Sequence, residues 1–274
     1  MTMLQLIVIA VVQGITEFLP ISSSGHLALT GQVCDWPDQG ILMDAGVHVG
    51  TLLAVVLYCH RDLFTMTGGM FQLARGRMTD GGRMLIHLVI GTIPLVIFGY
   101  LLVKFDLVDM FRTIEVIGWT TLGFGLLLYA ADRIGITVKR VEHMRFGGAL
   151  MIGLFQALAL IPGTSRSGIT MTAARMLGYE RHDSARFSML LSIPAILAAG
   201  TLTGLKLLEQ GDTQFTTDVL IAGGLAFGTA LVAIIAMMAW LKVASYTPFV
   251  IYRLILGVLL LGWAYGAWSL SGMC

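Results

Sequence analysis

The sequence predicts an all-α polytopic membrane protein with six transmembrane helices and two re-entrant helix-loop-helix hairpins in an inverted-topology repeat. Three features predict this fold: few charged residues, long apolar stretches, and two apolar segments broken at their middle. The chain has 274 residues, of which 57% are hydrophobic and 12% are charged. Soluble domains carry about 25% charged residues. The composition therefore excludes a soluble enzyme, a disordered chain and a nucleic-acid-binding protein.

Six continuous apolar stretches approach the length of about 20 residues that crosses a bilayer. Two further apolar segments, 3–31 and 146–177, each contain a proline followed by a cluster rich in Ser and Gly. Non-helical backbone at membrane depth is tolerated only where protein or a water-filled cavity surrounds it. We therefore interpret both broken segments as re-entrant hairpins. The six continuous stretches are 44–60, 84–103, 113–131, 186–206, 219–241 and 249–270.

The placement of Lys and Arg predicts the orientation. No cation precedes Arg61, whereas several acidic residues do, which places the first 60 residues on the outer face. With segment 61–83 inside and the second hairpin re-entrant, most cations fall on the cytoplasmic side, Arg175 among them, as the positive-inside rule requires. Arg166 and Arg253 are the exceptions, because both lie in apolar surroundings.

An internal repeat divides a single integral membrane domain, 1–274, into halves of about 1–143 and 144–274. Each half would contain one hairpin and three crossings, so the second half is inverted relative to the first. The tips of the two hairpins are then expected to meet near the bilayer midplane, where transporters with inverted repeats bind their substrates. Aligning Gln13 with Gln156 matches Ser22 with Ser165, Ser24 with Ser167 and Gly25 with Gly168.

The first hairpin carries a membrane-embedded acid. Gln13 and Glu17 are four residues apart and share one face of a helix, and an ionisable residue inside the membrane is usually functional. After Pro20, a run of serines begins a new half-helix whose free N–H groups suit an anion. His26, one turn further, is able to exchange protons near neutral pH. The run is Ser22, Ser23 and Ser24.

The second hairpin carries Arg166, whose planar guanidinium suits a phosphate. Hydroxyl side chains surround it, and they either orient Arg166 or contact the phosphate. The two tips together supply groups that suit phosphoryl transfer, which depends mostly on positioning and charge neutralisation. A diphosphate held beside Glu17 and Gln13 would also bind a divalent cation, Mg²⁺ or Ca²⁺. The hydroxyl residues are Ser165, Ser167 and Thr170.

Two motifs carry a resemblance to a known family. They are Gln13-x-x-x-Glu17-Phe-Leu-Pro-Ile-Ser22-Ser23-Ser24-Gly-His26 and Pro162-Gly-Thr-Ser165-Arg166-Ser167-Gly-x-Thr170. These resemble the signature motifs of the undecaprenyl-diphosphatase family, the bacitracin-resistance phosphatases, and the resemblance extends over the whole chain. It implies hydrolysis of the lipid substrate undecaprenyl diphosphate to the monophosphate in the bacterial cytoplasmic membrane, which recycles the carrier for peptidoglycan synthesis.

The resemblance also implies roles for individual residues. Glu17 would be the acidic motif residue, Ser23 the nucleophile, His26 a proton-transfer residue and Arg166 the phosphate clamp. The family pattern allows Glu or Gln at the position of Gln13. The Gln of this sequence weakens any scheme with two carboxylates on the metal.

Several alternatives stay open at this point. The nucleophile is either Ser23 or a water activated by the metal, with the active site opening to the outer side. A transporter or flippase for polyprenyl phosphates, or a hydrolase that also flips its product, fits the same repeat, and so does a homodimer. We expect Asp44 and Arg253 to pair structurally and His48 to be a packing residue.

Overall fold

The computed structural model describes residues 2–34, 36, 40–107, 109–134, 139–210 and 213–268. The side chains of residues 24, 28, 32, 41–42, 109, 199 and 201–216 lie outside this description. Throughout the described residues the secondary structure is helical, without a strand. The α-helices are α1 (Met3–Thr16), α2 (Ser23–Val33), α3 (Ile41–Tyr58), α4 (His60–Ala74), α5 (Asp80–Lys104), α6 (Ile114–Ile134), α7 (Phe146–Ala157), α8 (Arg166–Met176), α9 (Arg181–Gln210), α10 (Thr213–Leu241) and α11 (Thr247–Ala264).

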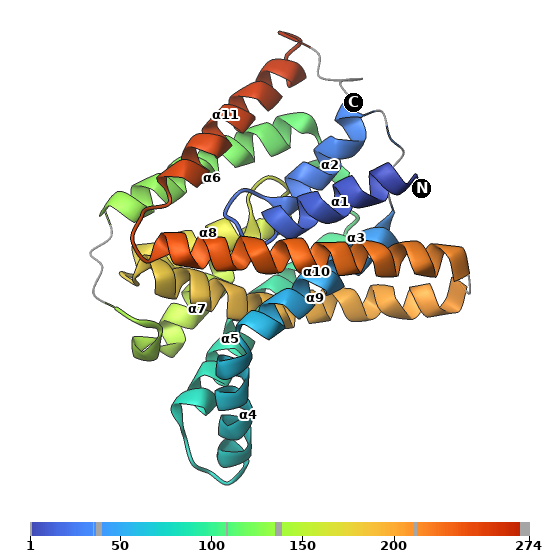
Figure 1. Cartoon of the computed structure of the whole chain (residues 1–274). Helices are drawn as coiled ribbons and strands as arrows, with labels where there is room; N and C mark the ends of the chain where they lie inside the picture. Colours follow the sequence, from blue (N-terminus) through green and yellow to red (C-terminus); the bar gives the residue numbers. More distant parts are fainter. Residues whose placement is uncertain are drawn as a thin grey trace.

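The long helices confirm an all-helical polytopic membrane protein. Each of the six predicted apolar stretches coincides largely with one long helix, namely α3, α5, α6, α9, α10 or α11 (Figure 1), although the predicted ends differ from the observed ends for α3, α6 and α11. By length and composition, four helices of the described chain are able to cross a membrane, or five if the bent pair of α3 and α4 forms one span. The four are α5, α6, α10 and α11.

Helix α4 is a feature that the sequence did not predict. Segment 61–83 was expected only as a charged cytoplasmic connection, but most of it forms α4, which is bent by 80° relative to α3. Helix α4 packs closely on the start of α5, because Gly69 brings its backbone against Gly81 and Gly82, where a Cβ atom would clash. Figure 1 shows α4 projecting beyond the rest of the bundle.

The two broken segments form helix pairs with the same local structure at the break. Helix α2 begins after Ser22 and helix α8 after Ser165, and both serines have a positive φ, 75° and 71°. Each serine caps its helix, since its Oγ accepts a hydrogen bond from the N–H of Gly25 or Gly168, at 3.3 and 3.1 Å. Positive φ is uncommon outside glycine. Its presence at both aligned serines therefore indicates that the two breaks have the same turn.

The first helix of each pair packs against a long helix from the other half of the chain. Helix α1 lies along α10, and helix α7 lies along α5 (Figure 1). Small residues permit both contacts: a Cβ on Gly14 would meet the backbone of α10, and a Cβ on Gly153 would meet Gly91. Each broken segment is therefore held by a long helix from the other half of the chain.

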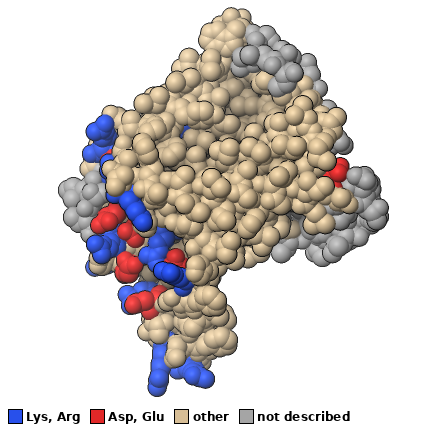
Figure 2. Space-filling model, in the orientation of Figure 1, with Lys and Arg blue, Asp and Glu red and all other residues tan. Residues whose placement is uncertain are grey.

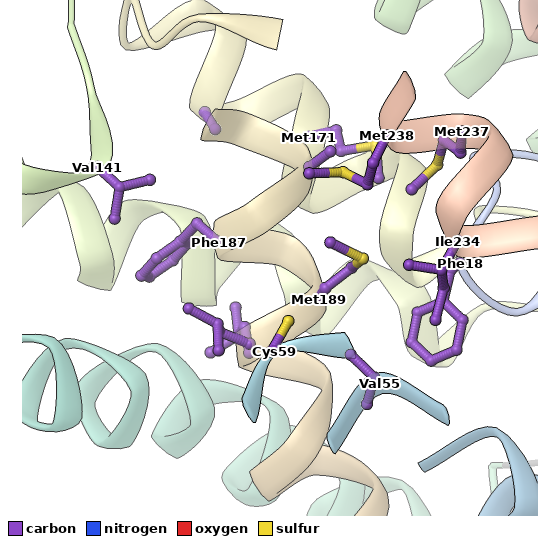
Figure 3. Packing of buried hydrophobic residues seen from close by; sticks show 14 of the residues in the cluster. Phe18, Val55, Cys59, Val141, Met171, Phe187, Met189, Ile234, Met237 and Met238 are labelled. Atoms are coloured by element: carbon purple, nitrogen blue, oxygen red, sulfur yellow. The ribbon is translucent and has the colours of Figure 1, made fainter. Parts of the chain in front are cut away.

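The largest buried hydrophobic cluster fixes the first loop. Phe18, which follows α1 and is 1% exposed, packs with residues of α3, α8, α9 and α10. Figure 3 shows its ring next to Ile234, with Met237 and Met238 of the same helix close by. Anchoring Phe18 in the core determines where the preceding residue, Glu17, projects.

Candidate active site

The loops of the two broken segments lie in direct contact, as the sequence predicted. Arg166 Nη2 donates a hydrogen bond to Glu17 Oε1 at 2.9 Å. Ser167 Oγ donates to the backbone oxygen of Leu19 at 2.8 Å. The acid of the first loop and the guanidinium of the second therefore form one buried ion pair.

The second oxygen of Glu17 binds three further side chains. Glu17 is 5% exposed, and its Oε2 accepts hydrogen bonds from Gln13 Nε2 at 2.9 Å and from Ser23 Oγ at 2.7 Å. His48 Nε2 lies 3.6 Å from the same oxygen. The carboxylate is therefore the centre of the cluster, and Ser23 is hydrogen-bonded to it as a nucleophile is to its general base.

Two buried polar atoms of this cluster are available to a ligand. Within the described part of the chain, Arg166 Nη1 and Gln13 Oε1 are buried and without a hydrogen-bond partner. Buried polar atoms are nearly always paired in folded proteins. One is a cationic donor and the other a neutral acceptor, so the cluster is able to receive an anion and a cation together.

The residues fit the predicted divalent cation only with help from the substrate. In the described residues, no group of three or more His, Cys, Asp or Glu side chains is close enough to hold a metal ion. Magnesium, however, commonly binds one or two carboxylates and completes its shell with substrate phosphates and water. Glu17 and the free Gln13 Oε1 provide oxygens of the right kind.

His26 lies at a second position of the site, on α2. Its Nδ1 is 2.7 Å from the backbone oxygen of Ser22, and its Nε2 is 2.5 Å from the hydroxyl of Tyr252 on α11. The rings of His26 and Tyr252 are also stacked, with centroids 5.6 Å apart and an interplanar angle of 11°. The described hydrogen bonds of His26 are thus separate from those of Glu17.

The serines of the first loop have different environments. Ser22 is buried and caps α2, whereas Ser23 is half-buried and faces Glu17. The side chain of Ser24, a predicted phosphate ligand, lies outside the described residues. Of the serines that the structure describes in this loop, Ser23 alone contacts the carboxylate.

The hydroxyl residues of the second loop support the start of α8. Ser165 caps the helix and lies 3.2 Å from Ser167 Oγ. Thr170 Oγ1 donates to the backbone oxygen of Arg166 at 2.9 Å and is 2.7 Å from Ser188 Oγ. These contacts hold the turn that presents Arg166.

Arg253 of α11 joins the two loops by a route that the sequence did not predict. The side chain is fully buried, and its five described hydrogen bonds all go to backbone oxygens instead of to the Asp44 carboxylate that we expected. The Arg253 guanidinium therefore binds the backbone of both loops. The acceptors are Pro20, Thr120, Thr121, Gly163 and Thr164.

One further expectation was wrong. His48 contacts Glu17, whereas we expected only packing. Arg175, which we counted among the cations of the cytoplasmic side, is 1% exposed and donates to Asp132 Oδ1 at 3.0 Å. Arg181 binds the same carboxylate at 2.8 Å. Arg175 therefore belongs to a buried ionic network at the end of α8 and not to the solvated cations.

Comparison with known proteins gives similarity along almost the whole chain. The family described as bacitracin resistance protein BacA matches residues 6–259. A relative named undecaprenyl-diphosphatase 1, from Rhodospirillum rubrum, is 52% identical over 271 residues, which cover 97% of this chain and 96% of the relative. The undecaprenyl-diphosphatases of Roseobacter denitrificans and Ruegeria pomeroyi are 49% and 51% identical, each over 97% of this chain and 100% of the relative.

Proposed function

Because this chain belongs to the bacitracin resistance protein BacA family, we propose that the cluster around Glu17 is the centre at which it hydrolyses undecaprenyl diphosphate. The products are undecaprenyl phosphate and inorganic phosphate, and the reaction serves cell-wall synthesis and bacitracin resistance. One observation supports this centre above the others. Ser23 Oγ donates to a buried carboxylate whose second oxygen holds Arg166. The matched relatives give no support to a transporter.

The first chemical step uses the Ser23–Glu17 pair. Ser23 Oγ attacks the terminal phosphorus, its proton passes to Glu17 Oε2, and the bond from that phosphorus to the bridging oxygen breaks. Undecaprenyl phosphate leaves, and the phosphoryl group is bonded to Ser23. Arg166 Nη1, which has no partner among the described residues, donates to the phosphoryl oxygens and stabilises the charge that they carry.

The second step releases phosphate by attack of water. In-line displacement places the attacking water opposite Ser23 Oγ, so the group that deprotonates the water is not Glu17. We assign this to His26, which passes the proton to solvent. Glu17 returns its proton to Ser23 Oγ as the bond from phosphorus to Oγ breaks. Hydrogen phosphate leaves, and both side chains regain their starting protonation.

We also propose a divalent cation, Mg²⁺ or Ca²⁺, bound by Glu17 and Gln13 Oε1 together with the diphosphate. When bound, it would neutralise negative charge on the substrate. The purified protein is expected to release phosphate from undecaprenyl diphosphate in Mg²⁺ and to stop when the cation is chelated. Gln13→Leu is expected to raise the Mg²⁺ concentration for half-maximal rate about tenfold. Failure to release phosphate would contradict the function, and release unaffected by chelation would contradict the cation.

The finer architecture is also a proposal: six crossings and two re-entrant hairpins in inverted repeats, in the bacterial cytoplasmic membrane, with the site open to the outer side. The matching caps at Ser22 and Ser165 and the exchanged packing of α1 and α7 support the repeat. Figure 2 supports the orientation, since Lys and Arg gather at the end of the molecule that bears α4.

Cysteine labelling tests this orientation. In right-side-out vesicles, Arg112→Cys is expected to react with a membrane-impermeant maleimide added outside. Arg77→Cys is expected to react only after permeabilisation, because both positions are exposed and the proposed topology places them on opposite sides. The unsubstituted chain, labelled in parallel, is the control for its own cysteines, which are Cys34, the buried Cys59 and Cys274. The reverse labelling pattern would invert the proposed topology.

A further inference from the structure

We propose that Tyr252 is the residue that positions His26 for the second step, the attack of water on the phosphoserine. This inference rests on the proposed function and adds a residue outside both sequence motifs. Tyr252 is on α11, and the contact with His26 is therefore made between residues far apart in the sequence.

The hydrogen bonds of His26 define its protonation state. A neutral imidazole has one N–H and one lone pair. The backbone oxygen of Ser22 only accepts, so Nδ1 carries the hydrogen in its 2.7 Å contact. Nε2 is then the basic nitrogen, and the Tyr252 hydroxyl donates to it at 2.5 Å. The two contacts together select the tautomer with a basic Nε2. Because the Tyr252 hydroxyl occupies that lone pair, the attacking water gives its proton to the Tyr252 oxygen while Tyr252 passes its own hydroxyl proton to Nε2.

Stacking adds a second constraint on the imidazole. The Tyr252 and His26 rings are within 11° of parallel, so rotation of the imidazole about χ2 would break both the stacking and the hydrogen bond. Ser22 belongs to the loop, His26 to α2 and Tyr252 to α11. The imidazole is therefore held from two independent elements, which is how positioning residues keep a base within productive geometry.

The position of Tyr252 is itself fixed by the next residue. Arg253 is fully buried and donates to backbone oxygens of both loops, at Pro20, Gly163 and Thr164. One turn of α11 therefore carries both Arg253, which binds the two loops, and Tyr252, whose phenol lies beside His26. Tyr252 is 42% exposed, so its ring is not required to fill the core, and a hydroxyl deletion there is tolerable for folding.

Tyr252→Phe tests the inference, because it removes the hydroxyl and keeps the ring. We expect kcat to fall about 10- to 100-fold and KM to fall with it, so that kcat/KM changes little. The phosphorylated form of the enzyme is expected to accumulate during turnover, since only the second step is slowed. Tyr252→Leu, which also removes the stacking, is expected to lower kcat further. Tyr265→Phe is the matched control: it deletes a hydroxyl near the end of the same helix that accepts a hydrogen bond from Trp119 at 3.2 Å, and it is expected to leave turnover unchanged.

A double-mutant cycle separates positioning from general damage to the fold. In a His26→Ala background, Tyr252→Phe is expected to have no further effect on kcat, because its role is exercised through the imidazole. Additive losses, or wild-type kcat in Tyr252→Phe while His26→Ala is impaired, would overturn the inference and leave the proposed function intact. Full activity in His26→Ala would instead contradict the proposed role of His26 itself.

Discussion

Replacing Glu17 by Gln is expected to lower kcat by about 10²–10⁴-fold, the usual contribution of a general base, and to destabilise the folded protein as well. The amide is not able to take the proton of Ser23. It also leaves the Arg166 guanidinium, whose side chain is 16% exposed, without its countercharge. Breaking a buried pair on one side costs about 3–5 kcal/mol.

The double variant Glu17→Gln/Arg166→Met separates the two effects. Removing both members of a buried pair is often close to neutral for stability, so we expect most of the lost thermal stability in detergent to return. Hydrolysis is expected to stay absent, because both the base and the phosphate clamp are gone. The measurements are phosphate release and the midpoint of thermal unfolding for the two single variants and the double variant.

An exposed ion pair provides the control. Arg83 and Asp80 are 3.3 Å apart at the start of α5, with side chains 46% and 88% exposed. Exposed pairs contribute at most about 1 kcal/mol, so Arg83→Met is expected to leave both stability and hydrolysis nearly unchanged. If Glu17→Gln were as stable and as active as Arg83→Met, the buried pair would be neither a structural nor a catalytic centre.

The contact between the two loops was predictable because it follows from local pattern and symmetry. The Pro- and Ser-rich breaks mark where each helix restarts, and the match of Ser22 with Ser165 predicts the same turn twice. A glutamate and an arginine in otherwise apolar hairpins have few partners other than each other. Sequence therefore suffices to bring Glu17 and Arg166 together once the repeat is accepted.

The contacts of His48 and Tyr252 were not predictable in the same way. His48 reaches Glu17 from α3 and Tyr252 reaches His26 from α11. Both contacts depend on the rotation of one long helix relative to a hairpin. That rotation is set by packing between small residues, such as Gly14 against α10, which no spacing within a motif encodes.

The positions of Lys and Arg in the sequence also left some tertiary contacts unpredicted. Arg175 was counted as a cytoplasmic cation because segment 146–177 was interpreted as re-entrant, but its spacing did not predict that it is buried and hydrogen-bonded to Asp132, 43 residues earlier in the chain. Helix α4 was missed because segment 61–83 was interpreted from its cations alone, whereas residues 60–74 form a helix that packs on the start of α5. Both features depend on tertiary contacts that the local pattern does not encode.

Replacing Ser23 by Ala is expected to lower kcat by at least about 10³-fold, as loss of a covalent nucleophile does. It is also expected to abolish the phosphorylated enzyme that the wild type forms from substrate labelled in the terminal phosphate. The label should be stable to acid and to hydroxylamine, as a phosphoserine is. A phosphorylated Glu17 would be lost with hydroxylamine, and a phosphorylated His26 would be lost in acid.

Ser22→Ala, at the adjacent serine, is the matched comparison for Ser23→Ala. It removes the cap of α2 and is expected to cost about 1 kcal/mol of stability, but it keeps the Ser23–Glu17 hydrogen bond and should still form the phosphorylated enzyme. Loss of the label in Ser22→Ala and its retention in Ser23→Ala would exchange the roles of the two serines.

The stereochemistry at phosphorus decides between a serine and a water as the nucleophile, whatever the rate at which the intermediate decays. Two successive in-line displacements, first by Ser23 Oγ and then by water, return a chiral terminal thiophosphate with retention of configuration. A single attack by water gives inversion. We expect retention, because the 2.7 Å hydrogen bond already aligns Ser23 Oγ with the base that takes its proton. Inversion would assign the attack to water and leave Ser23 as a residue that only orients Glu17.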